Sequence, residues 1–479
     1  MIRRIQDIMR QDSGVDGDAQ RIAQLVWLLF LKIYDAKEEY WEFYEEAYQS
    51  IIPEELRWRN WAVDKKDGQA LTGQALLDFI NNKLFTTLKE LPIDETTDKR
   101  SAIVKHVFED AYNYMKNGTL IRQVINIMNE VDFTESGERH AFNDVYEVIL
   151  KDLQSAGNSG EYYTPRPVTD FIVEMLNPKL GEKIADYACG TGGFLISSLK
   201  YLEKQVKTPE DKELMQQNVY GIEKKPLPYL LAVTNMILHD IDSPGVRHDN
   251  SLNTSVREFK DEDRADVIVM NPPYGGIEEE AVKINFPVEM QSSETADLFM
   301  ALILYRLKRN GRVGVVLPDG FLFGTDNAKV AIKRKLLEEC NLHTIVRLPA
   351  GVFAPYTSIT TNLLFFEKTG RTKEVWYYEH QVGYGTKNYT KTKQIRLSDF
   401  APERLWWTQR AESEHAWKVN IEAIVNNNYN MDIKNPAKDQ AKQFQSSDEL
   451  LNQLKDSIEK TASLLKRMEQ LVSNANDLR

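Results

Sequence analysis

The fold is decided by the stretch Asp186-Tyr187-Ala188-Cys189-Gly190-Thr191-Gly192-Gly193-Phe194. It connects an apolar run at residues 183–188, which predicts a strand, to an amphipathic run at residues 194–202, which predicts a helix. Glycines at such a turn let the backbone bend tightly and approach a ligand at the switch point of an α/β sheet. Gly192 and Gly193 are adjacent, so the turn is not the spaced G-x-G-x-x-G of dinucleotide enzymes. The stretch therefore indicates either another kind of cofactor turn or a purely structural loop.

Strand-like and helix-like runs alternate downstream of this turn. The expected elements lie at residues 219–222, 227–239, 267–270, 297–307, 313–317, 330–337, 345–348, 361–366 and 375–378. This alternation is typical of a Rossmann-like, doubly wound α/β sheet. We therefore expect the α/β fold class, with the sheet in a domain that spans residues 153–415.

The two flanking regions have helical patterns. Residues 1–152 predict an all-helical N-terminal domain, because apolar residues recur at helical spacing, for example over residues 22–33. Residues 153–160 are small, polar and Gly-containing, which predicts a linker. Residues 416–479 predict a C-terminal helical tail, in which residues 451–472 carry apolar side chains at heptad steps. Such a seam packs either on its own domain or on another subunit, and we favour the second.

Composition narrows the class of protein. The chain has 479 residues, of which 42% are hydrophobic and 28% charged, as in ordinary globular proteins. Its two cysteines are too few for a disulfide scaffold or a Cys₄ zinc site, and we expect no metal. The longest apolar run, residues 25–31, is too short to cross a bilayer, and no targeting pattern opens the chain. We therefore expect a cytoplasmic protein without membrane contact.

The charge is unevenly distributed along the chain. The formal net charge of −12 argues, taken alone, against nucleic-acid binding through bulk charge. Residues 1–150 and 151–300 carry −9 and −10, whereas residues 301–400 carry +8. This basic block, which includes Lys329 to Lys335, indicates either a solvated helix face or a surface for phosphates.

An acidic residue follows the next predicted strand. Glu223 lies roughly 30 residues after the glycine turn, where a carboxylate can accept hydrogen bonds from two ribose hydroxyls. Together, the turn and the acid favour a nucleoside-containing cofactor. Cys189 has no identifiable His or Asp partner, so we expect it to be a small buried residue rather than a nucleophile.

A third motif, Asn271-Pro272-Pro273-Tyr274, follows the strand predicted at residues 267–270. The two prolines fix a stiff turn just outside the strand. The Asn271 side-chain oxygen and the Pro272 carbonyl can then accept both N–H groups of a planar amine, such as the exocyclic amine of adenine. These acceptors favour attack of the nitrogen on a methyl sulfonium, and Tyr274 offers a flat face for an unstacked base. A plain Asn-Pro turn is the structural alternative.

In this order, the three motifs resemble the N6-adenine DNA methyltransferases that use S-adenosylmethionine (SAM). The segment Gly160-Glu161-Tyr162-Tyr163-Thr164-Pro165-Arg166 resembles the GE(F/Y)(F/Y)TPR motif of the modification (methyltransferase, M) subunits of Type I restriction–modification systems. The resemblance spans nearly the whole chain and implies methyl transfer from SAM to adenine N6 in duplex DNA. One departure is Tyr187, where many relatives have Pro, and this leaves the rigidity of the loop open.

The resemblance also implies roles for individual residues. Those implied to line the methionine end of SAM and close over it are Glu161, Tyr162, Tyr163, Thr164, Pro165 and Arg166. Asp186 is implied to lie near the amino group of SAM, and the cradle for the cofactor consists of Gly190, Thr191, Gly192 and Gly193. Glu223 is implied to bind the ribose and Asp249 to contact the adenine of SAM. The implied catalytic set is Asn271, Pro272, Pro273 and Tyr274.

Other functions fit part of the pattern. The NPPY tetrad also occurs in methyltransferases that act on protein or free-amide glutamine, because that amide nitrogen is an equally poor nucleophile. The helical N-terminal region, the basic block and the Thr164-Pro165-Arg166 segment argue against this alternative. A catalytically silent scaffold that binds SAM and DNA is disfavoured by the intact tetrad. The adjacent glycines and the tetrad together disfavour a dehydrogenase.

The chain lacks an obvious segment for reading DNA sequence. Between Glu223 and Asn271 there is no insert of domain size, so we expect this subunit to methylate without choosing the site. The resemblance implies a separate specificity (S) subunit, two M subunits per complex, a restriction (R) subunit, and duplex DNA with a flipped adenine. The seam at residues 451–472 is the candidate for docking on the S subunit. The acidic balance predicts weak DNA binding by the isolated chain.

Overall fold

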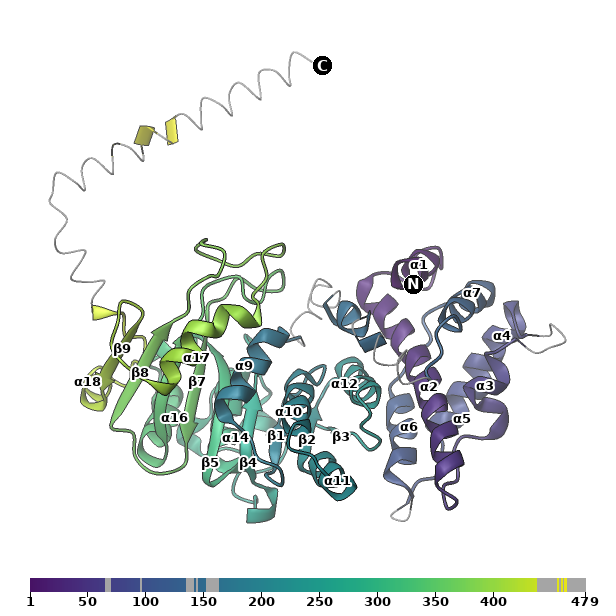
Figure 1. The fold of residues 1–479 in the computed structure, drawn as a ribbon, viewed down its shortest axis with the longest axis horizontal. Coiled ribbons are helices and arrows are strands. Elements are labelled where there is room, and N and C mark those ends of the chain that lie inside the picture. The colour runs from purple at the N-terminus through teal and green to yellow at the C-terminus, as the bar shows by residue number, and fades with distance from the viewer. Residues whose placement is uncertain are drawn as a thin grey trace.

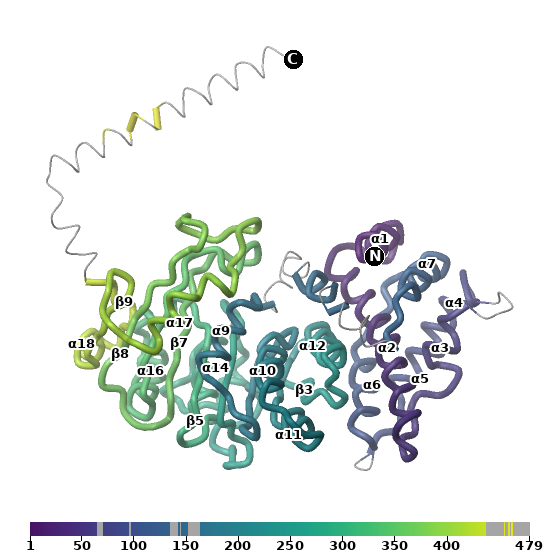
Figure 2. The backbone as a smooth tube through the Cα atoms, viewed as in Figure 1, coloured from purple at the N-terminus to yellow at the C-terminus, as the bar shows by residue number. Residues whose placement is uncertain are grey.

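The computed structural model describes residues 1–64, 70–94, 97–134, 142–143, 145–151 and 163–436, together with residues 455, 458, 459, 461 and 462. Within these ranges, a helical N-terminal part precedes a sheet that is covered by helices (Figure 1). Figure 2 follows the same path as a tube, from the purple helix α1 to the yellow strand β9. The chain thus has the α/β fold with a preceding helical region that the sequence predicted.

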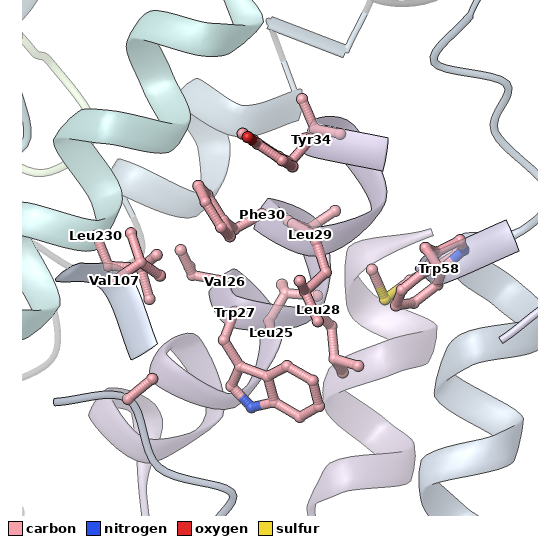
Figure 3. Close-up of a cluster of buried hydrophobic side chains, with 14 of the residues drawn as sticks. Leu25, Val26, Trp27, Leu28, Leu29, Phe30, Tyr34, Trp58, Val107 and Leu230 are labelled. Carbon is pink, nitrogen blue, oxygen red and sulfur yellow. The ribbon is translucent and has the colours of Figure 1, made fainter. Parts of the chain in front are cut away.

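The N-terminal part has a hydrophobic core of its own. Its helices are α1 (Ile2–Met9), α2 (Asp18–Tyr44), α3 (Trp58–Trp61), α4 (Gly73–Phe79), α5 (Phe85–Lys89), α6 (Lys99–Glu109) and α7 (Gly118–Met128), with further helical residues at 142–143 and 145–151. A π-helical turn at Ile80–Leu84 joins α4 to α5. The apolar run at residues 25–31 buries α2 on nearly all sides, and Figure 3 shows it beside Val107 of α6. Each fully buried Leu or Phe contributes about 1.5–3 kcal/mol, so this run anchors the helical part.

The sheet in the described residues has the strand order β3-β2-β1-β4-β5-β7-β6-β8-β9. The strands are β1 (Ile184–Asp186), β2 (Val219–Glu223), β3 (Gly245–His248), β4 (Ala265–Met270), β5 (Leu307–Pro318), β6 (Asn341–Arg347), β7 (Thr361–Glu367), β8 (Glu374–Glu379) and β9 (Ala416–Asn420). Only β7 and β9 run antiparallel to their neighbours. The other strands therefore end at one side of the sheet, the carboxyl edge, where the loops that follow them meet.

Helices cover both faces of the sheet. One face packs against α9 (Arg166–Leu176), α10 (Gly193–Glu203) and α12 (Pro226–Leu238), and the other against α14 (Thr295–Arg306) and α16 (Asn327–Glu339). Side chains of β4 alternate accordingly, because Val267 and Val269 join the first core and Ile268 and Met270 the second. The shorter helices are α11 (Pro209–Asn218), α13 (Glu280–Lys283), α15 (Asp319–Phe323), α17 (Ala401–Thr408) and α18 (Ile421–Asn426), with 3-10 turns at Glu54–Leu56, Asp261–Asp263, Val288–Met290 and Leu397–Phe400.

Helix α12 joins the two parts of the molecule. Its Leu230 and Leu231 belong to the N-terminal core, whereas its Ala232 packs in the core under the sheet. Directly after this helix, Asp240 lies 2.7 Å from the Lys37 ammonium of α2. The helical part is therefore attached to α12, the helix that connects β2 to β3.

One predicted boundary needs correction. The sequence placed the start of a helical tail at residue 416, but β9 pairs antiparallel with β8, and Trp417 stacks on Tyr377 at 5.3 Å. The sheet therefore continues past the predicted boundary, because a strand of five residues carries too short an alternation to stand out in the sequence. After residue 163, the helices and strands that the sequence analysis did not include are α9, α11, α13, α15, α17, α18, β3 and β9.

The predicted C-terminal seam lies largely outside the described residues. Of residues 451–472, those at 455, 458, 459, 461 and 462 are described, and they are helical and exposed. The docking role of the seam stays a prediction. No described helix has both the length and the apolar character needed to cross a bilayer.

Candidate active site

The carboxyl edge is hollowed by a cavity of about 600 Å³. Nine of the predicted site residues line it: Thr164, Asp186, Gly190, Gly193, Glu223, Asp249, Asn271, Pro273 and Tyr274. They come from the segment before α9 and from the segments at the ends of β1, β2, β3 and β4. The fold thus brings the three sequence motifs and the Thr164-Pro165-Arg166 segment to one place.

The glycine turn presents its backbone to the cavity. Gly190 and Gly192 have φ values of +54° and +78°, which residues with a Cβ rarely adopt. A Cβ on Gly193 would lie 2.9 Å from Nη1 of Arg166, so a side chain there would collide. The Asn235 amide of α12 donates to the Thr191 carbonyl at 3.0 Å and holds the turn from behind. The turn is therefore a fixed surface that leaves room for a ligand.

Two buried carboxyl groups lie beside the turn. Glu223 accepts hydrogen bonds from the Gly190 N–H at 2.9 Å and the Lys225 N–H at 2.7 Å, one at each carboxylate oxygen. A carboxylate oxygen has two acceptor positions, so Glu223 can also accept from ligand hydroxyls. Burial, and then repulsion from Glu223, raises the pKa of Asp186 well above its usual range. This wall suits a ligand that carries hydroxyl and ammonium donors.

Asp249 and Tyr187 complete this side of the cavity. The Asp249 N–H donates to the Glu223 carbonyl at 3.0 Å, and its half-exposed carboxylate lies 3.3 Å from the Arg247 guanidinium. The Tyr187 carbonyl accepts from the Ser251 hydroxyl at 2.6 Å, and its buried ring lies 4.5 Å from the Arg306 guanidinium. Tyr187, which stands where many relatives have Pro, therefore anchors the loop through both its backbone carbonyl and its ring.

The Asn271 amide is oriented from both ends. Its Nδ2 donates to Oγ1 of Thr164 at 3.0 Å, and its Oδ1 accepts from the Tyr274 hydroxyl. The nitrogen end of the amide thus faces Thr164 and the oxygen end faces Tyr274. The Tyr274 ring meets Phe353 edge-on, with the ring centroids 6.4 Å apart. Burial raises the pKa of Tyr274 well above its usual range, so its hydroxyl stays protonated and donates.

Several predicted residues are not among those that line the cavity. These are Tyr163, Pro165, Arg166, Thr191, Gly192 and Pro272, whereas Glu161 and Tyr162 fall outside the described residues. The Arg166 Nε and Nη2 atoms donate to one oxygen of Glu147, at 2.8 and 2.6 Å. Its Nη1 atom is buried without a hydrogen-bond partner in the part of the chain that the structure describes, and it points at Gly193.

Sequence reasoning missed part of the site. The additional lining residues include Lys224, Asn250, Ser251, Asn253, Ile277, Glu278, Val282, Thr295 and Phe299. Lys224, Asn250 and Ser251 directly follow β2 and β3, so their position after a strand was the available signal. Glu147 and Phe353 reach the site through tertiary contacts alone, and no local pattern in the sequence indicates either residue.

Comparison with known families gives two matches that cover most of the chain. The model for the N-6 DNA Methylase family matches residues 137–444. The model for the HsdM N-terminal domain matches residues 1–128.

Individual relatives agree with these matches. The Type I restriction enzyme EcoEI methylase subunit of Escherichia coli is 55% identical, over 91% of this chain and 90% of that protein. The EcoKI methylase subunit of Escherichia coli K12 is 30% identical, over 77% of this chain and 68% of that protein. The crystal structure of a modification subunit from Vibrio vulnificus YJ016 is 42% identical, with a TM-score of 0.80 over 91% of this chain and 96% of that one.

Proposed function

The chain belongs to the N-6 DNA methylase family, as a methylase subunit of the Type I restriction enzymes, and we propose that its cavity holds SAM beside an adenine bound by Asn271–Tyr274. It is an adenine-specific DNA methyltransferase. What we propose beyond the family is the role of each residue, the cofactor and the partners.

The donors and acceptors around the cavity fit SAM. The paired oxygens of Glu223 suit the two ribose hydroxyls, and Asp186 suits the amino group of the methionine moiety. The buried Nη1 of Arg166 points at Gly193, which has no side chain. A ligand carboxylate at this point would accept its hydrogen bond. A buried donor without a partner costs about 1–3 kcal/mol, so a ligand that bonds it gains that energy. When bound, SAM supplies an electrophilic methyl group on a positively charged sulfur.

The target adenine is held by acceptors on the turn after β4. We assign Oδ1 of Asn271 to one N–H group of the adenine N6 amine, and to the other the Pro272 carbonyl, which belongs to the peptide bond with the cavity-lining Pro273. Two acceptors draw electron density toward the nitrogen and favour a pyramidal geometry, which makes its lone pair available for attack on the methyl group. The same acceptors hold the nitrogen until its extra proton passes to water. Tyr274 provides an aromatic surface for the base once it has left the duplex, and the buried Phe353 packs edge-on against the Tyr274 ring.

The observation that carries this assignment is the oriented amide of Asn271. Thr164 accepts from its nitrogen, so its oxygen is kept as the acceptor that the target amine requires. The residue also lines the cavity that contains Gly190 and Glu223. The amide and the proposed cofactor site therefore share one space.

The test is methylation of duplex DNA by the complex with its specificity partner. Nucleosides from the product are separated and identified by mass spectrometry. We expect N6-methyladenine, and we expect Asn271→Ala to lower its rate of formation by about a hundredfold or more, since removal of one preorganised polar group at a reaction centre has that effect. A methyl group on cytosine, or on protein glutamine in place of DNA, would contradict the assignment.

The partners proposed for the chain follow from the system to which it belongs. We propose that an S subunit chooses the DNA site, that two copies of this chain join it, and that an R subunit completes the complex. We also propose that the seam at residues 451–472 docks on the S subunit. Removing the residues after Ser446 should abolish co-purification with the S subunit and leave SAM binding intact. Retained co-purification would contradict the docking role.

A further inference from the structure

Most cationic side chains of the basic block, residues 301–400, make contacts within the protein. The Lys329 side chain of α16 lies 3.0 Å from Asp297, and the Lys333 ammonium donates to the Leu322 and Gly324 carbonyls at 2.7 Å. These two lysines are only 4% and 0% exposed, and burial lowers the pKa of Lys333 to about 8. Lys335 pairs with Glu339 on the same helix. Lys329 and Lys333 of α16 are therefore structural, whereas Arg334 is exposed and lies 5.3 Å from the Tyr429 ring.

Other cations of the block are paired as well. Arg312 donates to Glu182, Lys308 lies 2.8 Å from Asp266, and Lys368 donates to the Leu304 carbonyl. Arg347 lies 2.5 Å from Asp432. These contacts stabilise the sheet. Arg309, Arg371 and Lys373 are exposed, but they lie near the start of β5 and between β7 and β8, at the edge opposite the active site.

A different segment, the basic loop of residues 381–398, keeps its charge exposed. It carries Lys387, Lys391, Lys393 and Arg396 and no acidic residue. Arg396 lies 2.8 Å from Asp399, but the three lysines are exposed and have no carboxylate partner within the described residues. Of the acids near the loop, Asp399 pairs with Arg396 and Glu403 lies 2.7 Å from His380, whereas Asp319, Glu379 and Asp432 line a hollow together with Lys387. The loop is thus a patch of positive charge in a chain of net charge −12.

The fold places this loop on the same edge as the active site. It follows β8, which runs parallel to β6 and so ends at the carboxyl edge. Four strand spacings separate β8 from β4, which is about 19 Å. At about 3.4 Å per base pair, this span equals roughly six base pairs of duplex DNA.

The basic loop is also tied to the target-base site by direct contacts. The Tyr389 N–H donates to the Ala350 carbonyl at 3.1 Å, in the segment between β6 and β7 that carries Phe353. Phe353 in turn meets the Tyr274 ring. The buried hydroxyl of Tyr389 bonds His380 and Asp399 and anchors the middle of the loop. In Figure 1, the segment between β6 and β7 and the basic loop after β8 extend beyond the same edge of the sheet.

We propose that the basic loop binds the DNA backbone beside the flipped adenine, with Lys387, Lys391 and Lys393 as phosphate contacts. The exposed residues between and beside the lysines are Thr386, Asn388, Thr390, Thr392 and Gln394, and such polar side chains commonly bond phosphate oxygens. Protein interfaces have an apolar centre, whereas Tyr389 and Ile395 of this loop are buried. These features favour a nucleic-acid backbone over a protein partner.

The test compares two triple variants in the complex with the S subunit. The loop variant carries Lys387→Gln, Lys391→Gln and Lys393→Gln. The control carries Lys204→Gln, Lys207→Gln and Lys212→Gln, which remove the same charge from exposed positions around α11. Helix α11 leads into the start of β2, at the opposite edge of the sheet. Binding to duplex DNA is followed by fluorescence anisotropy over a range of salt concentrations, without methyl transfer.

We expect the slope of log K against log salt concentration to fall by about 0.9 for each phosphate that the loop no longer neutralises, so by about three for the loop variant. Affinity should fall equally for specific and unrelated sequences, and the control should match the wild type. An unchanged slope, or failure to co-purify with the S subunit, would overturn the proposal, the latter because the loop would then bind protein rather than DNA.

The inference rests on the proposed function only in taking duplex DNA as the substrate. Because binding is measured without catalysis, failure of the wild type to form N6-methyladenine would refute the proposed function separately. A loop variant that binds DNA more weakly should still bind SAM as the wild type does, measured by calorimetry.

Discussion

The two walls of the cavity are built in different ways. The cofactor wall, formed by residues 186–193 with Glu223, is fixed by hydrogen bonds to the backbone of loops that follow neighbouring strands. The target wall is formed by Asn271–Tyr274 and by Thr164, which the resemblance implies for SAM but whose hydroxyl bonds the Asn271 amide. It is held by side chains from segments far apart in the sequence, including the buried Phe353. On the target wall, the acceptor oxygen of Asn271 already receives the Tyr274 hydroxyl.

This difference separates binding of the cofactor from binding of the base. A wall fixed by its backbone is organised before the ligand arrives, which lowers the cost of binding. A wall whose acceptor is occupied must exchange one hydrogen bond when the adenine enters. Changes on the cofactor wall should therefore act on SAM affinity, and changes on the target wall should act on the rate of transfer.

The largest effect should come from Glu223→Ala. Each hydrogen bond to a charged group contributes about 1.5–3 kcal/mol, so removal of its two bonds to the ribose should weaken SAM binding by about a hundredfold or more. Calorimetry on the purified chain measures this affinity. Glu210→Ala, at an exposed position in the first turn of α11, is the matched control and should bind SAM normally. Unchanged affinity in Glu223→Ala would remove the ribose assignment.

Glu147→Ala should mainly reduce stability. The substitution leaves the partly buried guanidinium of Arg166 without its carboxylate, which costs about 2–3 kcal/mol. Urea unfolding followed by fluorescence measures the difference. Arg166→Met together with Glu147→Ala should recover part of this stability, because no buried charge then remains unpaired. A single Glu147→Ala variant as stable as the wild type would show that the pair contributes little.

Thr164→Val should slow methyl transfer by about tenfold, which is what one hydrogen bond of about 1.4 kcal/mol is worth. Valine keeps the shape of threonine and removes the acceptor for the Asn271 amide, which can then turn its nitrogen toward the base. The effect should fall on kcat and leave SAM affinity unchanged, and Thr164→Ser should restore the rate. An equally slow serine variant would mean that the methyl group, rather than the hydroxyl, positions Asn271.

Tyr274→Phe should have the smallest effect. The ring that faces the base is retained, and the hydroxyl that occupies Oδ1 of Asn271 is removed. We expect kcat within about threefold of the wild type and a KM for DNA that is unchanged or lower, since one competing hydrogen bond is worth about 0.5–1.5 kcal/mol. Tyr274→Ala, which removes the ring, should be much slower in the same assay. A Phe variant as slow as the Ala variant would assign the hydroxyl a direct role.

The cofactor wall was the more predictable of the two. Asp186 and Glu223 are the last residues of β1 and β2, Gly190 lies in the turn after β1, and the carboxyl ends of parallel strands meet at one edge. Asn271 was found in the same way. Its contact with Thr164 was not, because the two residues are 107 positions apart and nothing local in the sequence joins them.

The positions of exposed positive charge were predicted least well. Lys329 and Lys333 stand out in the sequence, but their ammonium groups are buried against Asp297 and backbone carbonyls. The basic loop stands out less in the sequence, yet its lysines lack carboxylate partners within the described residues. A charge count cannot distinguish a paired ammonium from an exposed one, because pairing depends on the tertiary fold. The strand at residues 416–420 was missed for the same kind of reason, since its partner β8 lies about 40 residues earlier.

The most direct test is to sequence the methylated bases of a bacterial host that carries this chain and its S subunit but no other DNA methyltransferase. We predict N6-methyladenine at one defined recognition sequence with the wild type and none with Asn271→Ala. Methylation at cytosine, or N6-methyladenine that persists in the Asn271→Ala strain, would contradict the central claim that the Asn271 amide holds the target amine.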